Sequence, residues 1–257
     1  MLEVRGLSKH FGGIRAVETC SFTVEAGSIT ALIGPNGAGK TTAFNCISKT
    51  MKPSAGEVWL DRVRIDGLRP HQVTKLGLSR TFQISRNLED LTVLENLVVQ
   101  SRVAHWRELL GPAVSAAERD KAAEILEFLD ITRLAHEETR SLSYGQKKLM
   151  DFGALLMSEP KIILLDEPAG GVNPRLLQEI VDRIRKLNER GLTVLIVEHN
   201  MELVMSLSHK VVVMAHGQVI AEGTPGEVQA NPLVLEAYLG GAAKDLPVPH
   251  VAGVGHA

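Results

Sequence analysis

The chain has 257 residues, 44% of them hydrophobic, which suffices for a sizeable core in one domain with a smaller lobe. Its 28 Lys and Arg balance 30 Asp and Glu, and only 4% of its residues are aromatic, so the composition argues against nucleic acid as a partner. No apolar run approaches the roughly 18 to 20 residues that span a bilayer, and the start lacks a signal-peptide core, so a soluble protein is expected. Cys20 and Cys46 lack metal-ligand spacing and are expected to be reduced and buried.

Short β-branched runs alternate with amphipathic helical patterns along the chain, which predicts an α/β fold. Three nearly all-apolar runs are typical of central strands buried on both faces, at 28–34, 162–166 and 193–199. A helix is expected after the first run, over 42–49. Another is expected over 173–191, between the last two runs, with Pro174 in its first turn and Gly191 at its end.

The stretch from about 82 to 158 lacks strand-like runs and consists mostly of helical patterns, the clearest at 91–103 and 115–130. We interpret it as a helical lobe inserted into an α/β core made of about 1–81 and 159–240, so that 1–240 form one domain. Residues 241–257 are aperiodic and rich in small residues, which is typical of a flexible tail.

A glycine-rich loop ends the first apolar run. Gly34, Gly39, Lys40 and Thr41 have the spacing GxxxxGKT of a P-loop, directly after an expected strand and before an expected helix. Glycines let the backbone wrap around phosphates, the helix N-terminus adds positive potential, the lysine reaches the β- and γ-phosphates, and the threonine hydroxyl suits Mg²⁺. The expected nucleotide-binding residues are Gly34, Pro35, Asn36, Gly37, Ala38, Gly39, Lys40, Thr41 and Thr42.

Two adjacent carboxylates end the second apolar run. Buried charges need partners, so an acid pair that ends an apolar strand is expected to have a function. Asp166 is the candidate for the Mg²⁺ side of the nucleotide, and Glu167 is the candidate to orient or deprotonate the attacking water. The alternative is a structural pair held by salt bridges.

Three single residues carry weaker signals. A histidine after a strand, such as His199, is more often a capping or packing residue. If the three apolar strands are neighbours, however, it faces the same rim as Lys40 and can sense a γ-phosphate. Gln83 alone reads as polar surface, and Phe11 either stacks on an adenine or belongs to the core.

The stretch LSYGQKK opens another expected helix. A serine at a helix start usually only caps it. Ser143 is followed by Gly145, Gln146 and two lysines, which are more polar groups than a cap requires. This pattern indicates that the helix end holds a ligand.

Together these residues resemble the ATP-binding subunit of an ABC transporter, over 2–240. The resemblance implies a P-loop ATPase core with a mainly parallel sheet, an N-terminal antiparallel β region and the inserted helical lobe. It also implies ATP and Mg²⁺ as cofactors and ATP hydrolysis coupled to transport. Three sets of roles follow from it: catalysis for Lys40, Glu167 and His199, the metal for Thr41, Gln83 and Asp166, and adenine stacking for Phe11.

In this family a signature loop of the LSGGQ type binds the γ-phosphate held by a second subunit. The partner's ATP is therefore expected to meet Ser143, Tyr144, Gly145 and Gln146. Tyr144 replaces the commonest first glycine of the signature. Asn173 stands where the family's D-loop usually has an aspartate, which leaves the role of Asn173 open.

Within the family, the stretches 34–48, 77–99, 167–174, 197–225 and 231–240 are similar to an ATPase of branched-chain amino acid importers. That resemblance implies a related partner ATPase, or a homodimer in isolation, and two membrane permease subunits contacted through 84–90. A periplasmic or extracellular binding protein would deliver the substrate, and the ATPase would lie peripherally on the cytoplasmic face of the inner (plasma) membrane. Urea, amides or other amino acids are alternative solutes.

Two other classes of protein fit the sequence less well. A non-transport ABC protein of DNA repair or translation typically has a long coiled-coil insertion or tandem cassettes, and this chain has one cassette. A P-loop kinase or GTPase needs no signature loop, and no NKxD base-recognition motif is present. The resemblance implies the ATPase of an importer, and an exporter or an importer of another solute is the alternative that stays open within the family.

Overall fold

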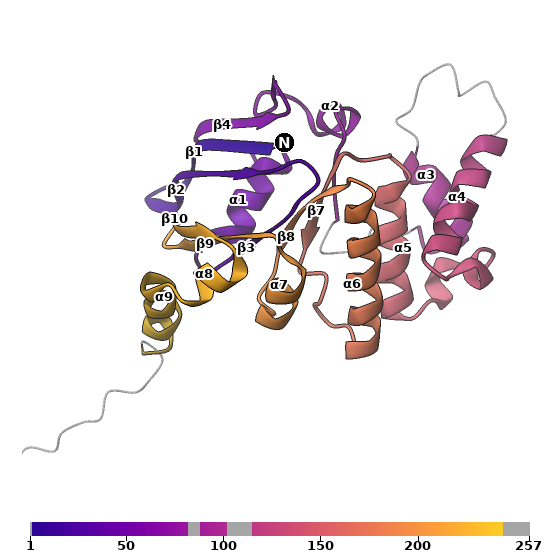
Figure 1. Cartoon of the computed structure of the whole chain (residues 1–257). Helices are drawn as coiled ribbons and strands as arrows, with labels where there is room; N and C mark the ends of the chain where they lie inside the picture. Colours follow the sequence, from indigo (N-terminus) through magenta and orange to yellow (C-terminus); the bar gives the residue numbers. More distant parts are fainter. Residues whose placement is uncertain (1, 82–87, 102–114, 244–257) are drawn as a thin grey trace, which may run out of the picture.

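The computed structural model describes residues 2–81, 88–101 and 115–243 (Figure 1). Its strands are β1 (Leu2–Phe11), β2 (Ile14–Val24), β3 (Ile29–Ile33), β4 (Ala55–Leu60), β5 (Val63–Arg64), β6 (Leu78–Arg80), β7 (Ile162–Asp166), β8 (Thr193–Val197), β9 (Lys210–Ala215) and β10 (Gln218–Gly223). Its helices are α1 (Lys40–Ile47), α2 (Pro70–Lys75), α3 (Val93–Ser101), α4 (Ala116–Phe128), η2 (Thr132–Leu134), η3 (Thr139–Ser141), α5 (Tyr144–Leu156), α6 (Pro174–Glu189), α7 (Met201–Leu207), α8 (Pro225–Gln229) and α9 (Pro232–Ala243).

The strands form two sheets. An antiparallel sheet has the order β2-β1-β4-β5, and a second sheet has the order β10-β9-β3-β8-β7-β6. In the second sheet β6, β7, β8, β3 and β9 run parallel, and β10 pairs antiparallel with β9 at the edge. The predicted fold class, a mainly parallel sheet with an N-terminal antiparallel region, is confirmed.

The three predicted central strands are neighbours, because β8 lies between β3 and β7. Every residue of these three strands is buried. Successive side chains of a strand point to opposite faces, so both faces of the sheet must be covered by other elements. This requirement explains why the three runs are apolar throughout instead of alternating.

The helix α1 covers one face of the parallel sheet and separates it from the antiparallel sheet (Figure 1). Phe44 and Ile47 of α1 are fully buried in a cluster with Leu2 of β1 and with Leu32 and Leu164 of the parallel sheet. The helix begins at Lys40, two residues before the predicted start. It is therefore fixed between two sheets, directly after the glycine-rich loop.

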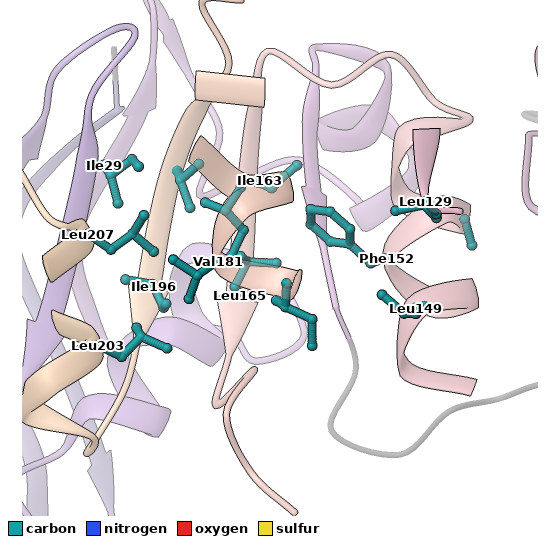
Figure 2. Packing of buried hydrophobic residues seen from close by; sticks show 14 of the residues in the cluster. Ile29, Leu129, Leu149, Phe152, Ile163, Leu165, Val181, Ile196, Leu203 and Leu207 are labelled. Atoms are coloured by element: carbon teal, nitrogen blue, oxygen red, sulfur yellow. The ribbon is translucent and has the colours of Figure 1, made fainter. Parts of the chain in front are cut away.

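The other face of the parallel sheet shares one apolar cluster with the helices between β6 and β7. Figure 2 shows Ile163 and Leu165 of β7 next to Val181 of α6, with Leu129 and Phe152 of the neighbouring helices beside them. In Figure 1 the helices α3, α4 and α5 stand together at the side of the molecule opposite β1 and β2. The core of this helical part is thus continuous with that of the sheet.

Cys20 and Cys46 are free and buried, as predicted, and burial raises the pKa of Cys20 to about 12. The helix α9 runs from Pro232 to Ala243 and so extends past residue 240, the predicted end of the domain. No helix in the described ranges combines the length and apolar character that a membrane span requires.

Candidate functional site

The glycine-rich loop between β3 and α1 has a backbone that only glycine allows at two points. Gly34 and Gly39 have φ of +149° and +95°, in the region that L side chains rarely adopt. A Cβ atom at Gly34 would collide with the carbonyl oxygen of Met214, and one at Gly39 with the carbonyl oxygen of Ala16. The loop is therefore packed against the backbone of two neighbouring segments, which fixes its shape before any ligand binds.

The N-terminus of α1 leaves its backbone donors available. Its N-cap, Gly39, makes no side-chain cap hydrogen bond, and the first N–H groups of a helix have no intrahelical partner. Lys40 folds back over the loop, where its Nζ donates to the carbonyl oxygens of Gly34 (2.7 Å) and Pro35 (3.0 Å). Burial lowers the pKa of Lys40, and the charge of Glu167 opposes that shift. This end of α1 is suited to an anion.

Asp166, the last residue of β7, is held by Arg80 at the end of β6. The Arg80 guanidinium donates to Asp166 Oδ2 at 2.8 Å, and the two side chains are 9% and 3% exposed. The same guanidinium donates to Asn45 Oδ1 (2.6 Å) and Ser48 Oγ (2.7 Å), which connects α1 to β7. Burial raises the pKa of Asp166, and the charge and hydrogen bond of Arg80 oppose that rise.

Sequence reasoning missed Arg80. It stands in the short strand β6, where a single arginine gives no more signal than a surface charge, and its partner is 86 residues away in the sequence. Its guanidinium also stacks on the ring of Phe44 at 4.7 Å from the centroid. Arg80 is therefore a buried residue whose guanidinium donates to acceptors on α1 and β7 and connects these two elements of the site.

Glu167 and His199 lie next to each other at the same edge of the sheet. His199 Nδ1 is 3.8 Å from Glu167 Oε1, and the two side chains are 65% and 38% exposed. Glu167 has a φ of +46°, and its N–H donates to the carbonyl oxygen of Val197 at 2.9 Å. A non-glycine residue in this conformation is strained, and such strain is concentrated at functional sites. Asp166 is thus buried and fixed, while its neighbour faces solvent.

A second acid beside His199 was also missed. Glu198 is 1% exposed, and its carboxylate accepts hydrogen bonds from the backbone N–H groups of Ala169 (2.8 Å), His199 (3.0 Å) and Asn200 (3.2 Å). Ala169 follows Glu167 by two residues, so this carboxylate joins the segments after β7 and β8. The sequence contains no pattern that separates such a residue from a surface glutamate.

The signature segment forms the N-terminus of α5, as predicted. Ser143 is the N-cap: its Oγ accepts from the N–H of Gln146, and Gln146 Oε1 accepts from the N–H of Ser143 at 2.8 Å. The hydroxyl of Tyr144 donates to the carbonyl oxygen of Gly170 at 3.3 Å, and Gly145 lies against Leu176 of α6. The segment is therefore seated on the loop that follows Glu167.

Phe11 and Asn173 lie at the ends of regular elements. Phe11, at the end of β1, is 45% exposed and pairs with Ile14 of β2, which is also exposed. Lys9 Nζ lies 5.0 Å from the centre of the Phe11 ring. Asn173 caps α6 through a hydrogen bond from the Leu176 N–H to its Oδ1 at 2.9 Å. Gln83 lies outside the described residues, as do 84–87 of the predicted permease contact.

A glycine-rich loop between a buried strand and a helix, with an acid pair two strands away at the same sheet edge, defines a P-loop nucleoside triphosphatase. The family model of ABC transporters matches residues 17–170, and a model of branched-chain amino acid ATP-binding cassette transporters matches residues 218–244. The chain belongs to the ABC transporter family, which confirms the resemblance of the motifs, and it is an ABC ATPase.

Curated relatives cover nearly the whole chain. The high-affinity branched-chain amino acid transport ATP-binding protein BraF of Pseudomonas aeruginosa is 41% identical over 251 residues, which is 94% of this chain and 98% of the relative. LivG of Escherichia coli K12, with the same description, is 38% identical over 94% of this chain and 98% of the relative.

Solved structures support the fold. A nucleotide-free ATP-binding cassette from an ABC transporter has a TM-score of 0.83 and 34% identity, and an ADP conformation of such a cassette has 0.84 and 35%. Each comparison covers 93% of this chain and 98% of the other. A dimeric cassette bound to ADP and Pi has a TM-score of 0.76 and 26% identity, over 88% of this chain and 99% of the other. Nucleotide binding and dimeric cassettes are therefore features of the family.

Proposed function

We propose that this ABC ATPase powers an importer of branched-chain amino acids. The proposal of the solute rests on the descriptions of BraF and LivG and on the match of residues 218–244. Its partners would be a related ATPase subunit, two membrane permease subunits and a periplasmic or extracellular binding protein. The ATPase would lie on the cytoplasmic face of the inner membrane.

The single observation that carries the catalytic proposal is the position of Glu167 beside His199, at the sheet edge that also bears the P-loop. The P-loop amides and Lys40 would hold the β- and γ-phosphates. Glu167 would take a proton from water as the water oxygen bonds to the γ-phosphorus and the bond from that phosphorus to the bridging oxygen breaks, which releases ADP and phosphate. His199 would contact the γ-phosphate, and Phe11 the adenine.

The oxygen donors at this edge suit Mg²⁺. Thr41 supplies a hydroxyl at the start of α1, and Asp166 supplies a carboxyl group paired with Arg80. Hard oxygen ligands are those that Mg²⁺ prefers. These two residues, with Gln83, would hold the ion. When bound, Mg²⁺ neutralises charge on the phosphate oxygens.

The signature would act on the other subunit's nucleotide. Ser143, Tyr144, Gly145 and Gln146 lie at an exposed helix N-terminus, which favours anions. In a two-fold dimer each P-loop would face the partner's signature, so two ATP molecules would be enclosed between two subunits. ATP drives closure only by the difference in its affinity for the closed and open states.

Glu167→Gln tests the catalytic proposal. The substitution keeps the size of the side chain and removes its basicity, so kcat for ATP hydrolysis should fall about 10²- to 10⁴-fold. An ATP-bound dimer should then accumulate in size-exclusion chromatography. Glu202→Gln, the same change at an exposed position of α7, is the control and should leave both properties unchanged. Hydrolysis at the wild-type rate in Glu167→Gln would exclude Glu167 as the base.

The solute is tested in cells that lack this protein. Uptake of labelled leucine, isoleucine and valine should be lost and should return with the wild type but not with Lys40→Ala. Unchanged uptake in the deletion strain would reject the branched-chain assignment and leave the ATPase assignment in place. Urea, amides and other amino acids would then be the solutes to assay.

A further inference from the structure

Glu198 is a fully buried carboxylate that the catalytic proposal does not use. Its side chain is 0% exposed, although it directly precedes His199, whose side chain is 65% exposed. Burying a charge is costly unless hydrogen bonds compensate it. Here three backbone N–H groups donate to the carboxylate, at 2.8 Å, 3.0 Å and 3.2 Å, and His199 Nδ1 lies 3.9 Å from its Oε2.

The three donors belong to two different segments. Oε2 accepts from His199 and Asn200, in the turn that leads from β8 into α7, which is a local arrangement. Oε1 accepts from Ala169, 29 residues away in the loop after β7. That loop begins with Glu167 and ends with Asn173, the N-cap of α6. One carboxylate therefore holds both segments that carry the proposed water-binding and phosphate-sensing groups.

A neutral side chain would not do the same. A glutamine has one amide oxygen and one NH₂ group, so its nitrogen would face a backbone N–H at one of the two segments. An apolar residue would leave the three N–H groups buried without acceptors. Only a charged acceptor with two oxygens satisfies both segments at this position.

We propose that Glu198 is a positioning residue that holds the loop 167–173 and the turn 198–200 together as one unit. It would thereby fix the separation of Glu167 and His199, whose Oε1 and Nδ1 atoms are 3.8 Å apart. The inference rests on the proposed catalytic roles of those two residues. It predicts that the two segments open and close together rather than one at a time.

Glu198→Asp separates the bond across the loops from the local bonds. An aspartate accepts readily from the N–H groups one and two residues ahead, so the bonds to His199 and Asn200 can persist. The side chain is one methylene shorter and no longer reaches Ala169. Glu202→Asp is the matched control, because Glu202 is exposed on α7.

Hydrogen–deuterium exchange followed by mass spectrometry gives a readout that does not depend on activity. In Glu198→Asp, peptides covering 167–173 should exchange about 10-fold faster or more, while peptides covering 201–207 keep their protection. Unchanged exchange of 167–173 would overturn the proposal, and so would faster exchange throughout α7 alone.

The wild type offers a second test, which holds even where the variant does not fold. The amides of Ala169, His199 and Asn200 should exchange at rates within about threefold of one another after correction for sequence, and a much faster Ala169 would overturn the proposal.

Kinetics distinguish positioning from a general structural role. Glu198→Asp should lower kcat about 10- to 100-fold at an unchanged KM for ATP, because misplaced catalytic groups slow chemistry without touching the P-loop. An unchanged kcat together with the faster exchange would overturn the positioning role. Should the wild type fail to hydrolyse ATP, the proposed function would be wrong, and the exchange data would still decide whether Glu198 joins the two segments.

Discussion

The N-termini of α1 and α5 are both proposed to bind phosphate, but their backbone N–H groups are capped differently. At α1 the N-cap is a glycine in the left-handed region that makes no side-chain cap bond, so the backbone donors of the first turn face outward without a competitor. At α5 Ser143 and Gln146 form a reciprocal capping box that satisfies two backbone N–H groups within the chain. The first end is prepared for a ligand, and the second is complete without one.

This difference fits the proposed division of work. The P-loop would bind ATP in the isolated subunit, so its donors must be free and its shape fixed in advance. The signature would contact ATP only in the dimer, so its helix must be stable in the isolated subunit without a ligand. The way each helix is anchored follows the same pattern. Arg80 ties α1 to Asp166 through buried charge, whereas Tyr144 and Gly145 seat α5 on the loop after β7 and on α6.

Replacement of Arg80 should have the largest effect, and it should lower the free energy of unfolding. Arg80→Met keeps most of the apolar stem but leaves Asp166 buried without its partner, and it removes the donors to Asn45 and Ser48. Loss of one member of a buried ion pair typically costs about 3–5 kcal/mol. The free energy of unfolding in urea should fall by that amount. Arg62→Met, at an exposed position, is the control and should change it by less than about 0.5 kcal/mol. Equal stability of the two variants would show that α1 is not fixed through Arg80.

Lys40→Ala should have a smaller effect and should act on binding rather than on folding. Among the residues that the structure describes, Lys40 donates to two carbonyl oxygens of its own loop. In the complex it would donate to phosphate, and hydrogen bonds to charged groups are worth about 1.5–3 kcal/mol. The affinity for ATP should fall about 10- to 100-fold by isothermal titration calorimetry, with an unchanged unfolding midpoint. Lys52→Ala, at an exposed position, should alter neither. Wild-type affinity in Lys40→Ala would remove the lysine from the phosphate site.

The motifs and the central strands can be predicted from the sequence, but the buried charged residues that hold the site together cannot. The P-loop, the acid pair and the central strands were predictable because motif spacing and continuous apolar runs are local signals. The neighbouring order of β3, β8 and β7 had to be assumed, and it decides whether His199 reaches Glu167. Arg80 and Glu198 could not be predicted, since their partners lie 86 and 29 residues away. A single charged residue in a strand, or directly after one, gives the same local signal whether it is buried or exposed.

Gln146→Glu tests whether the N-terminus of α5 faces phosphate, and it should change the stability of the monomer least. Glutamate at this position also completes a capping box, and a negative charge in the first turn of a helix stabilises it by about 0.3–1 kcal/mol. The unfolding midpoint of the monomer should therefore stay the same or rise slightly. The same charge would face the partner's triphosphate in the proposed dimer. ATP-driven dimerisation, measured in the Glu167→Gln background by analytical ultracentrifugation, should weaken by about tenfold, which corresponds to about 1.4 kcal/mol.

The two effects of Gln146→Glu have opposite signs, and this opposition separates the proposed role from simple capping. A residue that only caps α5 would change dimerisation in the same direction as monomer stability. Gln146→Ala is the matched control: it removes the side-chain half of the box and adds no charge, so it should lower monomer stability by about 0.5–1 kcal/mol and weaken the dimer less than Gln146→Glu. Dimerisation of Gln146→Glu at wild-type strength would mean that this helix end does not face phosphate. The capping box would then be its whole function, and the two helix ends would differ in purpose as well as in construction.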